Sequence, residues 1–236
     1  MRFSNFALII AAALPCQAQA QLSVRDLPNL DYGIATKYGD NVAGHESVED
    51  YQENLLENLA QCALLNNRSA VDRTLTLQAD SEAYLKSLIS LASTKCLRSG
   101  NYSLQPSAFR SALFRELYRS EFKRSPTLEL RNSVTYWKDI GNPASDFGKA
   151  YLVSRQLADC VVVADSRDSR KLVLLKIGDS HEEDKVFASL VTALQHCLPA
   201  GQTVSIDKYQ MTGWIAEALY RESKLALAAG ATGGKR

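Results

Sequence analysis

The sequence lacks the short motifs that identify the familiar hydrolases and nucleotide-binding proteins. It contains no G-x-S-x-G, H-E-x-x-H, P-loop or Rossmann glycine pattern. The Gly-Leu-Met-Gln signature of lytic transglycosylases is also missing. No enzyme class is therefore indicated by a motif, and we expect neither a cofactor nor a metal.

Charges of one sign are not concentrated anywhere in the chain. It has 27 basic and 26 acidic residues, and no basic block stands out. Proteins that bind nucleic acids or anionic membranes usually carry clustered Lys and Arg side chains. Nucleic acid is therefore not an expected partner.

Apolar runs long enough to span a bilayer are missing as well, since a membrane helix needs about 20 residues. The run at residues 6–14 is short, follows Arg2 and precedes Ala18-Gln19-Ala20, which is typical of a signal peptide. We therefore expect residues 1–20 to be an export signal, with no transmembrane segment after its removal. A buried N-terminal helix and a lipoprotein signal that uses Cys16 are the alternatives.

What the sequence does contain is a block of residues that occurs twice. The second copy follows the first at an offset of 98 residues at the first cysteine, 101 at the second cysteine and 102 at a Leu-Tyr-Arg sequence. A period near 100 residues is too long for a solenoid repeat and favours two duplicated subdomains. The copies are Cys62, Cys96 and Leu117-Tyr118-Arg119, then Cys160, Cys197 and Leu219-Tyr220-Arg221.

Four cysteines remain after residues 1–20, and an even number in an exported chain is typical of disulfides. Zinc sites usually contain close C-x-x-C pairs, and the sequence has none. Because each copy contains its own pair, we predict the disulfides Cys62–Cys96 and Cys160–Cys197. Each would stabilise the fold by roughly 4 kcal/mol by restricting the unfolded chain.

Apolar residues recur every three or four positions in both copies, which predicts amphipathic helices. The predicted fold is all-α, with two tandem related four-helix subdomains that each contain an internal disulfide. Predicted helices begin near Ser47, Ser69, Ser81 and Pro106 in the first copy, and near Ser145, Asp165, Ser180 and Asp207 in the second. The predicted order is a signal peptide at 1–20, an N-terminal arm at 21–46, helical repeat 1 at 47–124, a connector at 125–144, helical repeat 2 at 145–225 and a flexible tail at 226–236.

The repeated Tyr118-Arg119 and Tyr220-Arg221 pairs are the most site-like feature of the sequence. Arg binds carboxylates and phosphates and Tyr adds a hydroxyl, so the two pairs together would form a groove for an anionic ligand. The alternative is structural, with Tyr packing the helix end and Arg favouring its C-terminal dipole. Glu217 is a further candidate, as the acid of a helical enzyme that cleaves cell-envelope sugars.

Three stretches of the second copy carry a resemblance to small exported bacterial proteins of no known function. They are Cys160-Val161-Val162, the sequence CLPAGQT from Cys197, and the sequence AEALYR from Ala216. The resemblance covers residues 150–222, and the first copy more loosely. It implies a bacterial, periplasmic location and a duplicated helical module, and it implies no activity.

These features favour a non-enzymatic exported protein that binds a protein partner or supports an assembly of the cell envelope. The absence of a catalytic motif, the balanced charge and the duplicated, disulfide-linked scaffold support this hypothesis. The alternatives are a cell-envelope hydrolase without a recognisable motif and a binder of a small anionic ligand through Arg119 and Arg221.

Overall fold

The computed structural model describes residues 48–93, 96, 104–125, 130, 134–176, 180–198 and 207–233. These residues form helices joined by turns and loops, which confirms the predicted all-α class. The predicted signal peptide and N-terminal arm at residues 1–46 lie outside the described residues. The helices are α1 (Val48–Leu75), α2 (Glu82–Ser93), α3 (Pro106–Phe122), the short 3-10 helix η2 (Trp137–Asp139), α4 (Asp146–Ala164), α5 (Ser166–Leu174), α6 (Ser180–Cys197) and α7 (Lys208–Gly233).

Three helices begin at side chains that the sequence marks as caps. Ser81, Ser145 and Asp207 precede α2, α4 and α7. Each accepts a hydrogen bond from the backbone N–H three residues later, at 3.1, 3.0 and 2.9 Å respectively. Such a bond satisfies a donor that the first turn of a helix leaves unpaired, and this fixes where the helix starts.

The first and second copies bend at the same position. Helix α1 is kinked at Asn67, whose φ and ψ are −155° and 67°. Asp165, which separates α4 from α5, lies 98 residues later and has φ and ψ of −143° and 78°. Both side chains cap the following helix, with Asn67 Oδ1 accepting from Ala70 N and Asp165 Oδ1 from Asp168 N. Helix α1 is thus two helices of the repeat, and each copy contains the four predicted helices.

Each copy is closed by its own disulfide, as predicted. Cys62 at α1 is bonded to Cys96 just after α2, with 5.7 Å between their Cα atoms. Cys160 on α4 is bonded to Cys197 at the end of α6, with 5.8 Å between their Cα atoms. Both bridges therefore join the first and third helices of a copy.

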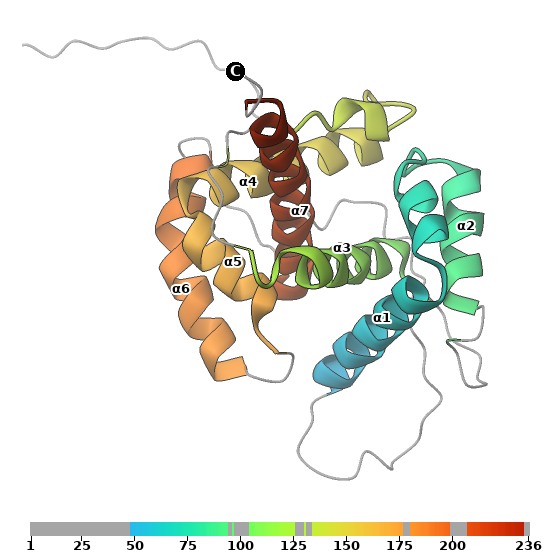
Figure 1. The fold of residues 1–236 in the computed structure, drawn as a ribbon, viewed down its shortest axis with the longest axis horizontal. Coiled ribbons are helices and arrows are strands. Elements are labelled where there is room, and N and C mark those ends of the chain that lie inside the picture. The colour runs from blue at the N-terminus through green and yellow to red at the C-terminus, as the bar shows by residue number, and fades with distance from the viewer. Residues whose placement is uncertain are drawn as a thin grey trace, which may run out of the picture.

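The two copies meet through their last helices. Helices α3 and α7 cross near the middle of the molecule, with α1 and α2 on one side and α4, α5 and α6 on the other (Figure 1). At the crossing, a Cβ added to Gly213 would overlap Ser111 Cβ and Oγ and lie 3.0 Å from Ser111 Cα. Only glycine allows this close approach. The buried apolar side chains of both copies form one continuous core around the crossing.

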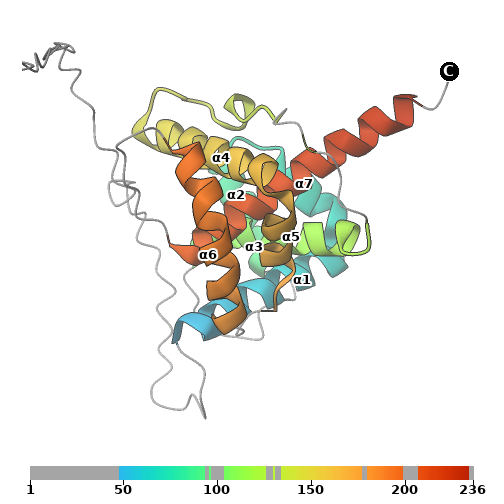
Figure 2. The ribbon, with the colours of Figure 1, turned by 90° about the vertical axis from the view of Figure 1, so that its left-hand side faces the viewer.

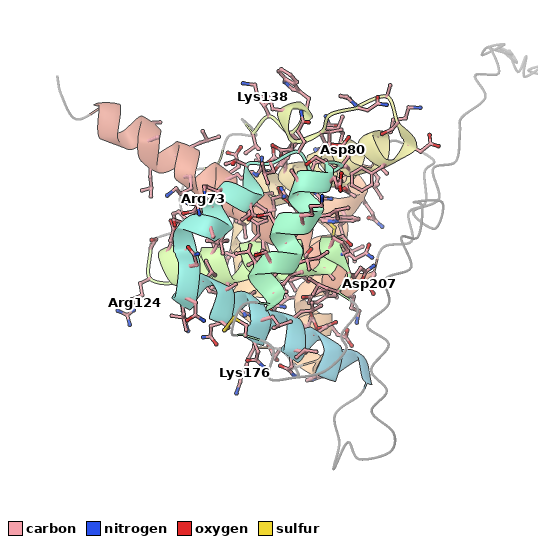
Figure 3. The ribbon with its side chains drawn as sticks, turned by 90° about the vertical axis from the view of Figure 1, so that its right-hand side faces the viewer. Arg73, Asp80, Arg124, Lys138, Lys176 and Asp207 are labelled. Atoms are coloured by element: carbon pink, nitrogen blue, oxygen red, sulfur yellow. A yellow bond between two sulfur atoms is a disulfide. The ribbon has the colours of Figure 1, made fainter. Side chains whose placement is uncertain are left out.

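The connector between the copies is tied to the first copy. The sequence of the connector is compatible with either extended or irregular structure. In the structure, its segment from Val134 to Ile140 contains the 3-10 helix η2. Asp80, in the turn before α2, accepts hydrogen bonds from Gly141 N at 2.8 Å and Asn142 N at 3.0 Å. Asp80 and Lys138 of the connector lie at the same end of the molecule (Figure 3). The connector thus positions the start of the second copy.

Helix α7 extends beyond the body of the molecule. The predicted tail begins at residue 226, but α7 is helical as far as Gly233, because this alanine-rich segment has high helix propensity. The end of α7 projects away from the other helices (Figure 2). None of the helices in the described residues combines the length and the apolarity that crossing a membrane requires.

Candidate functional site

The most heavily charged buried site surrounds Glu217 of α7. Its carboxylate lies 2.6 Å from Arg110 Nη2, 2.8 Å from Arg221 Nη2 and 3.4 Å from Arg155 Nε. Arg110 belongs to α3 of the first copy, whereas Arg155 and Arg221 belong to α4 and α7 of the second. We call these four residues the Glu217 cluster.

The arginines of the Glu217 cluster also contact side chains outside the cluster. Arg221 also pairs with Asp139 of the connector at 2.7 Å. Arg110 donates to Tyr151 Oη at 3.0 Å, and Tyr151 Oη lies 3.3 Å from Asp139 Oδ2. The cluster therefore joins both copies and the connector. Removing one charge from such a buried network is costly because its partners stay buried and unpaired.

The Glu217 carboxylate is held in its ionised form. Burial alone would raise its pKa, but the guanidinium groups of Arg110, Arg221 and Arg155 hold the pKa well below its usual range. A general acid must carry a proton at the working pH. The surroundings of Glu217 therefore do not support the role of a proton-donating acid.

A second ion-pair site occupies the equivalent place in the first copy, with its charges exchanged. Arg115 of α3 pairs with Glu57 of α1 at 2.9 Å. Glu57 and Arg155 are equivalent at the offset of 98 residues, and Arg115 and Glu217 at the offset of 102. The first copy thus has a glutamate on its first helix and an arginine on its last helix, and the second copy has the reverse.

The arginine of the Leu-Tyr-Arg sequence binds the acid in both copies. Arg119 pairs with Glu57 and with Glu116, and it donates to the backbone carbonyls of Val173 and Leu175 at the end of α5. Arg221 pairs with Glu217, as described above. The two arginines thus pair with different carboxylates, Arg119 with Glu57 and Glu116 and Arg221 with Glu217 and Asp139.

The tyrosines of this sequence are also bonded to protein side chains. Tyr118 Oη accepts a hydrogen bond from Arg170 of α5 at 3.0 Å. Tyr220 Oη accepts from Arg68 at 3.0 Å and donates to Glu121 at 3.0 Å, which joins α7 to α1 and α3. The structural interpretation of Tyr118, Arg119, Tyr220 and Arg221 accounts for these contacts, and ligand binding by them stays a prediction.

Two buried carboxyl groups lie beside the Glu217 cluster, at the point where α7 leaves the body. Asp159 of α4 and Glu222 of α7 are each 1% exposed. Burial, and next the charge of Glu222, raise the pKa of Asp159 to about 7, whereas a hydrogen bond from Tyr136 and the charge of Arg221 act in the opposite direction. Asp159 is thus a buried group that changes charge near neutral pH.

The end of α7 carries exposed apolar side chains. Ser223 is buried, but Leu225 and Leu227 are 45% and 52% exposed. Ala228 and Ala229 are exposed too. A helix in water normally presents polar side chains on its solvent side, so this segment differs from an ordinary surface helix.

Metal-ligand side chains do not gather in the part of the chain that the structure describes. There, no group of three or more His, Cys, Asp and Glu residues is placed to hold a metal ion.

Comparison with known proteins found no match to this chain among protein-family models, curated proteins or solved structures.

Of the residues in these sites, the sequence indicates Glu217, Arg119 and Arg221. It does not indicate the others, which lie outside the repeated letters: Glu57, Arg110, Arg115 and Arg155. The exchange of Glu57 and Arg115 for Arg155 and Glu217 appears only when the two copies are aligned by their cysteines and their Leu-Tyr-Arg sequences. Alignment of the two copies does not indicate a role for Asp159, because the equivalent residue of the first copy is the uncharged Gln61.

Proposed function

We propose that the chain is a non-enzymatic protein of the bacterial cell envelope that binds a protein partner through the end of α7. The observation that carries the proposal is the exposure of Leu225 and Leu227 on a helix segment that has left the body (Figure 2). Apolar side chains that gather on a projecting helix are typical of a surface that another molecule covers.

The shape of the apolar surface favours a protein groove over a membrane. Leu225 and Leu227 are two positions apart, so they point about 200° apart around the helix axis. A helix that lies on a membrane has one apolar and one charged side. A helix with apolar side chains on opposite sides fits a groove that encloses it, and the small Ala228 and Ala229 allow close helix packing.

The charge of the α7 end predicts which side chains lie at the rim of the groove in the partner protein. Lys224, Lys235 and Arg236 are basic, and the sequence has no acidic side chain after Glu222. An apolar groove with acidic residues at its rim would complement both features, because opposite charges steer association.

Export to the periplasm is part of the proposal. Two disulfides favour an oxidising compartment, since the cytosol keeps thiols reduced. The signal-like residues 1–20 and the resemblance to exported bacterial proteins support the same location.

Photo-cross-linking in the producing cells tests the proposal. A photoreactive amino acid at position 225 or 227 should give the same cross-linked protein, and Lys224→Glu should weaken the product. The same group at Val191 of α6, which is also 45% exposed, serves as the matched control. Cross-links to lipid alone, or to a second copy of the chain, would contradict the proposed partner. So would an identical product from position 191.

A further inference from the structure

The disulfide of the first copy has a hydrogen-bond donor beside it. Asn66 follows Cys62 by four positions, so the two side chains lie on the same face of α1. The Nδ2 atom of Asn66 lies 3.1 Å from Cys62 Sγ and 3.7 Å from Cys96 Sγ. The same nitrogen donates to the backbone carbonyl of Cys62 at 3.0 Å. Since a carbonyl oxygen only accepts, this bond fixes the orientation of the amide, whose N–H groups face the bridge.

The equivalent residue of the second copy cannot supply such a donor. Ala164 follows Cys160 by four positions and corresponds to Asn66 at the offset of 98 residues, and its side chain has no N–H or O–H group. The four bonded cysteines are all half-buried, so both bridges reach the surface. The two bridges also close similar lengths of chain, with sequence separations of 34 and 37 residues. The amide of Asn66 is therefore a difference between two otherwise matched disulfides.

We propose that Cys62–Cys96 is a site of thiol–disulfide exchange with a dithiol reductant, whereas Cys160–Cys197 is a permanent link. The first thiolate of the reductant attacks Cys96 Sγ, and the bond between the two cysteines breaks with its electron pair on Cys62 Sγ. The second thiolate then attacks the reductant's own sulfur in the mixed disulfide and releases Cys96. The reductant leaves as a disulfide, and the two cysteines take up the two protons that it lost.

Asn66 favours this direction of attack because its amide stabilises the charge that develops on the leaving sulfur. An N–H group donates a stronger hydrogen bond to a thiolate than to the uncharged sulfur of a disulfide. A thiolate that is better stabilised leaves faster. The Nδ2 atom is closer to Cys62 Sγ than to Cys96 Sγ, so Cys62 is the favoured leaving group and Cys96 is the sulfur attacked.

Reduction of this bridge would release one end of α2 from α1. Helix α2 lies at the edge of the molecule and packs mainly against α1 (Figure 1). The second bridge, between Cys160 and Cys197, would still join α4 to α6. The protein would thus respond to a reductant in its first copy only. The inference goes beyond the proposed function and does not depend on it, because the end of α7 belongs to the second copy.

Timed reduction of the oxidised protein with dithiothreitol, itself a dithiol, tests the inference. The thiols that appear are alkylated at intervals and located by peptide mass spectrometry. Cys62–Cys96 should open about three- to tenfold faster than Cys160–Cys197, which is the effect of strengthening one hydrogen bond by the charge on its acceptor. Equal rates, or faster opening of the second bridge, would overturn the inference.

Two reciprocal variants assign the difference to the amide. Asn66→Ala should slow the opening of the first bridge by the same factor and leave the second bridge unchanged. Ala164→Asn should speed the opening of the second bridge. Gln61→Ala, at an exposed position of α1, is the matched control and should change neither rate. Loosening of the helix end would speed the opening, so slower opening in Asn66→Ala cannot result from lost structure. An unchanged or faster rate in that variant would contradict the role of Asn66.

A monothiol shows which sulfur leaves. Glutathione should form its mixed disulfide with Cys96 and leave Cys62 as the free thiol that alkylation labels. Adducts found mainly on Cys62 would refute the direction of attack that Asn66 imposes.

Discussion

Ser111 and Gly213 occupy the same position in the two copies, and they contact each other where α3 crosses α7. Contacts between equivalent residues are what a symmetric dimer has at its two-fold axis. The copies are therefore joined face to face through their last helices. The sequence repeat alone does not distinguish this arrangement from copies placed side by side.

The first prediction concerns this crossing. Gly213→Ala should lower the free energy of unfolding by about 2 to 4 kcal/mol, because the new Cβ overlaps Ser111 and the two helix backbones must separate. The exchange Ser111→Gly with Gly213→Ser should recover part of the loss, since it moves the larger residue to the other side of the axis. Urea unfolding measures both effects.

A matched glycine provides the control for the crossing. A Cβ on Gly141 would meet the ends of the Gln78 and Asp80 side chains, which can move aside. Gly141→Ala should therefore cost less than about 1 kcal/mol. Equal losses at Gly141 and Gly213 would contradict the close backbone contact.

The second prediction concerns the exchanged ion pairs. Glu57→Arg should lower the free energy of unfolding by about 3 kcal/mol, because it places a third cation beside the buried Arg115 and the half-buried Arg119. Adding Arg115→Glu should recover at least half of this loss, since the second copy uses that arrangement at Arg155 and Glu217. Recovery is incomplete because Arg115 also donates to the carbonyl of Val173.

A double-mutant cycle measures the coupling between these two positions. The same two substitutions made at exposed positions of α2, Glu82→Arg and Lys86→Glu, serve as the control because Glu82 and Lys86 form an exposed ion pair. Their coupling should stay below about 0.5 kcal/mol. Additive losses at positions 57 and 115 would show that the two sites are not equivalent.

The third prediction concerns the disulfides. Replacing both cysteines of either bridge with Ser should lower the free energy of unfolding by about 2 to 5 kcal/mol. The sequence separations are 34 and 37 residues, so the two losses should agree within about 1 kcal/mol. Peptide mapping without reduction should find Cys62 with Cys96 and Cys160 with Cys197. A peptide that links the two copies would refute the subdomain assignment.

The fourth prediction concerns pH. The pKa of Asp159 in the folded protein is about 7, above the value of 3.8 for an unperturbed carboxyl group. The folded state therefore binds this proton more tightly, and its stabilising effect is present at low pH and lost as pH rises from about 4 to 7. Asp159→Asn, which resembles the protonated form, should stabilise the protein at pH 8 by roughly 1 to 2 kcal/mol after allowance for solvent screening.

Thermal unfolding of the wild type and Asp159→Asn between pH 5 and 8 tests this expectation. The gap between the two melting temperatures should widen as pH rises from 5 to about 7 and stay constant above it, because the loss of stability ends at the folded-state pKa of about 7. A gap that is constant across this range would mean that the carboxyl group does not titrate there.

Local patterns in the sequence predict much of this fold. Caps such as Ser145 and Asp207 satisfy donors three residues away, and a cysteine pair within each copy can form only one bridge inside that copy. The central sites depend instead on which helix faces which. Arg110 meets Glu217 across 107 positions of sequence, and no local pattern predicts that contact. The end of α7 is ambiguous in the sequence, because its alanines fit an extension of the last helix and its glycines fit a flexible tail.

The exchanged charges also bear on the history of the chain. In a homodimer, a substitution on one subunit appears on the other, so two equivalent sites cannot carry opposite charges. A single chain has no such restriction. Arg110 pairs with Glu217, whereas the equivalent positions carry Thr212 and Arg115, which cannot form an ion pair with each other. One half of a single chain can therefore carry features that the other half lacks, as the second half does with Asp159, whose equivalent in the first half is Gln61.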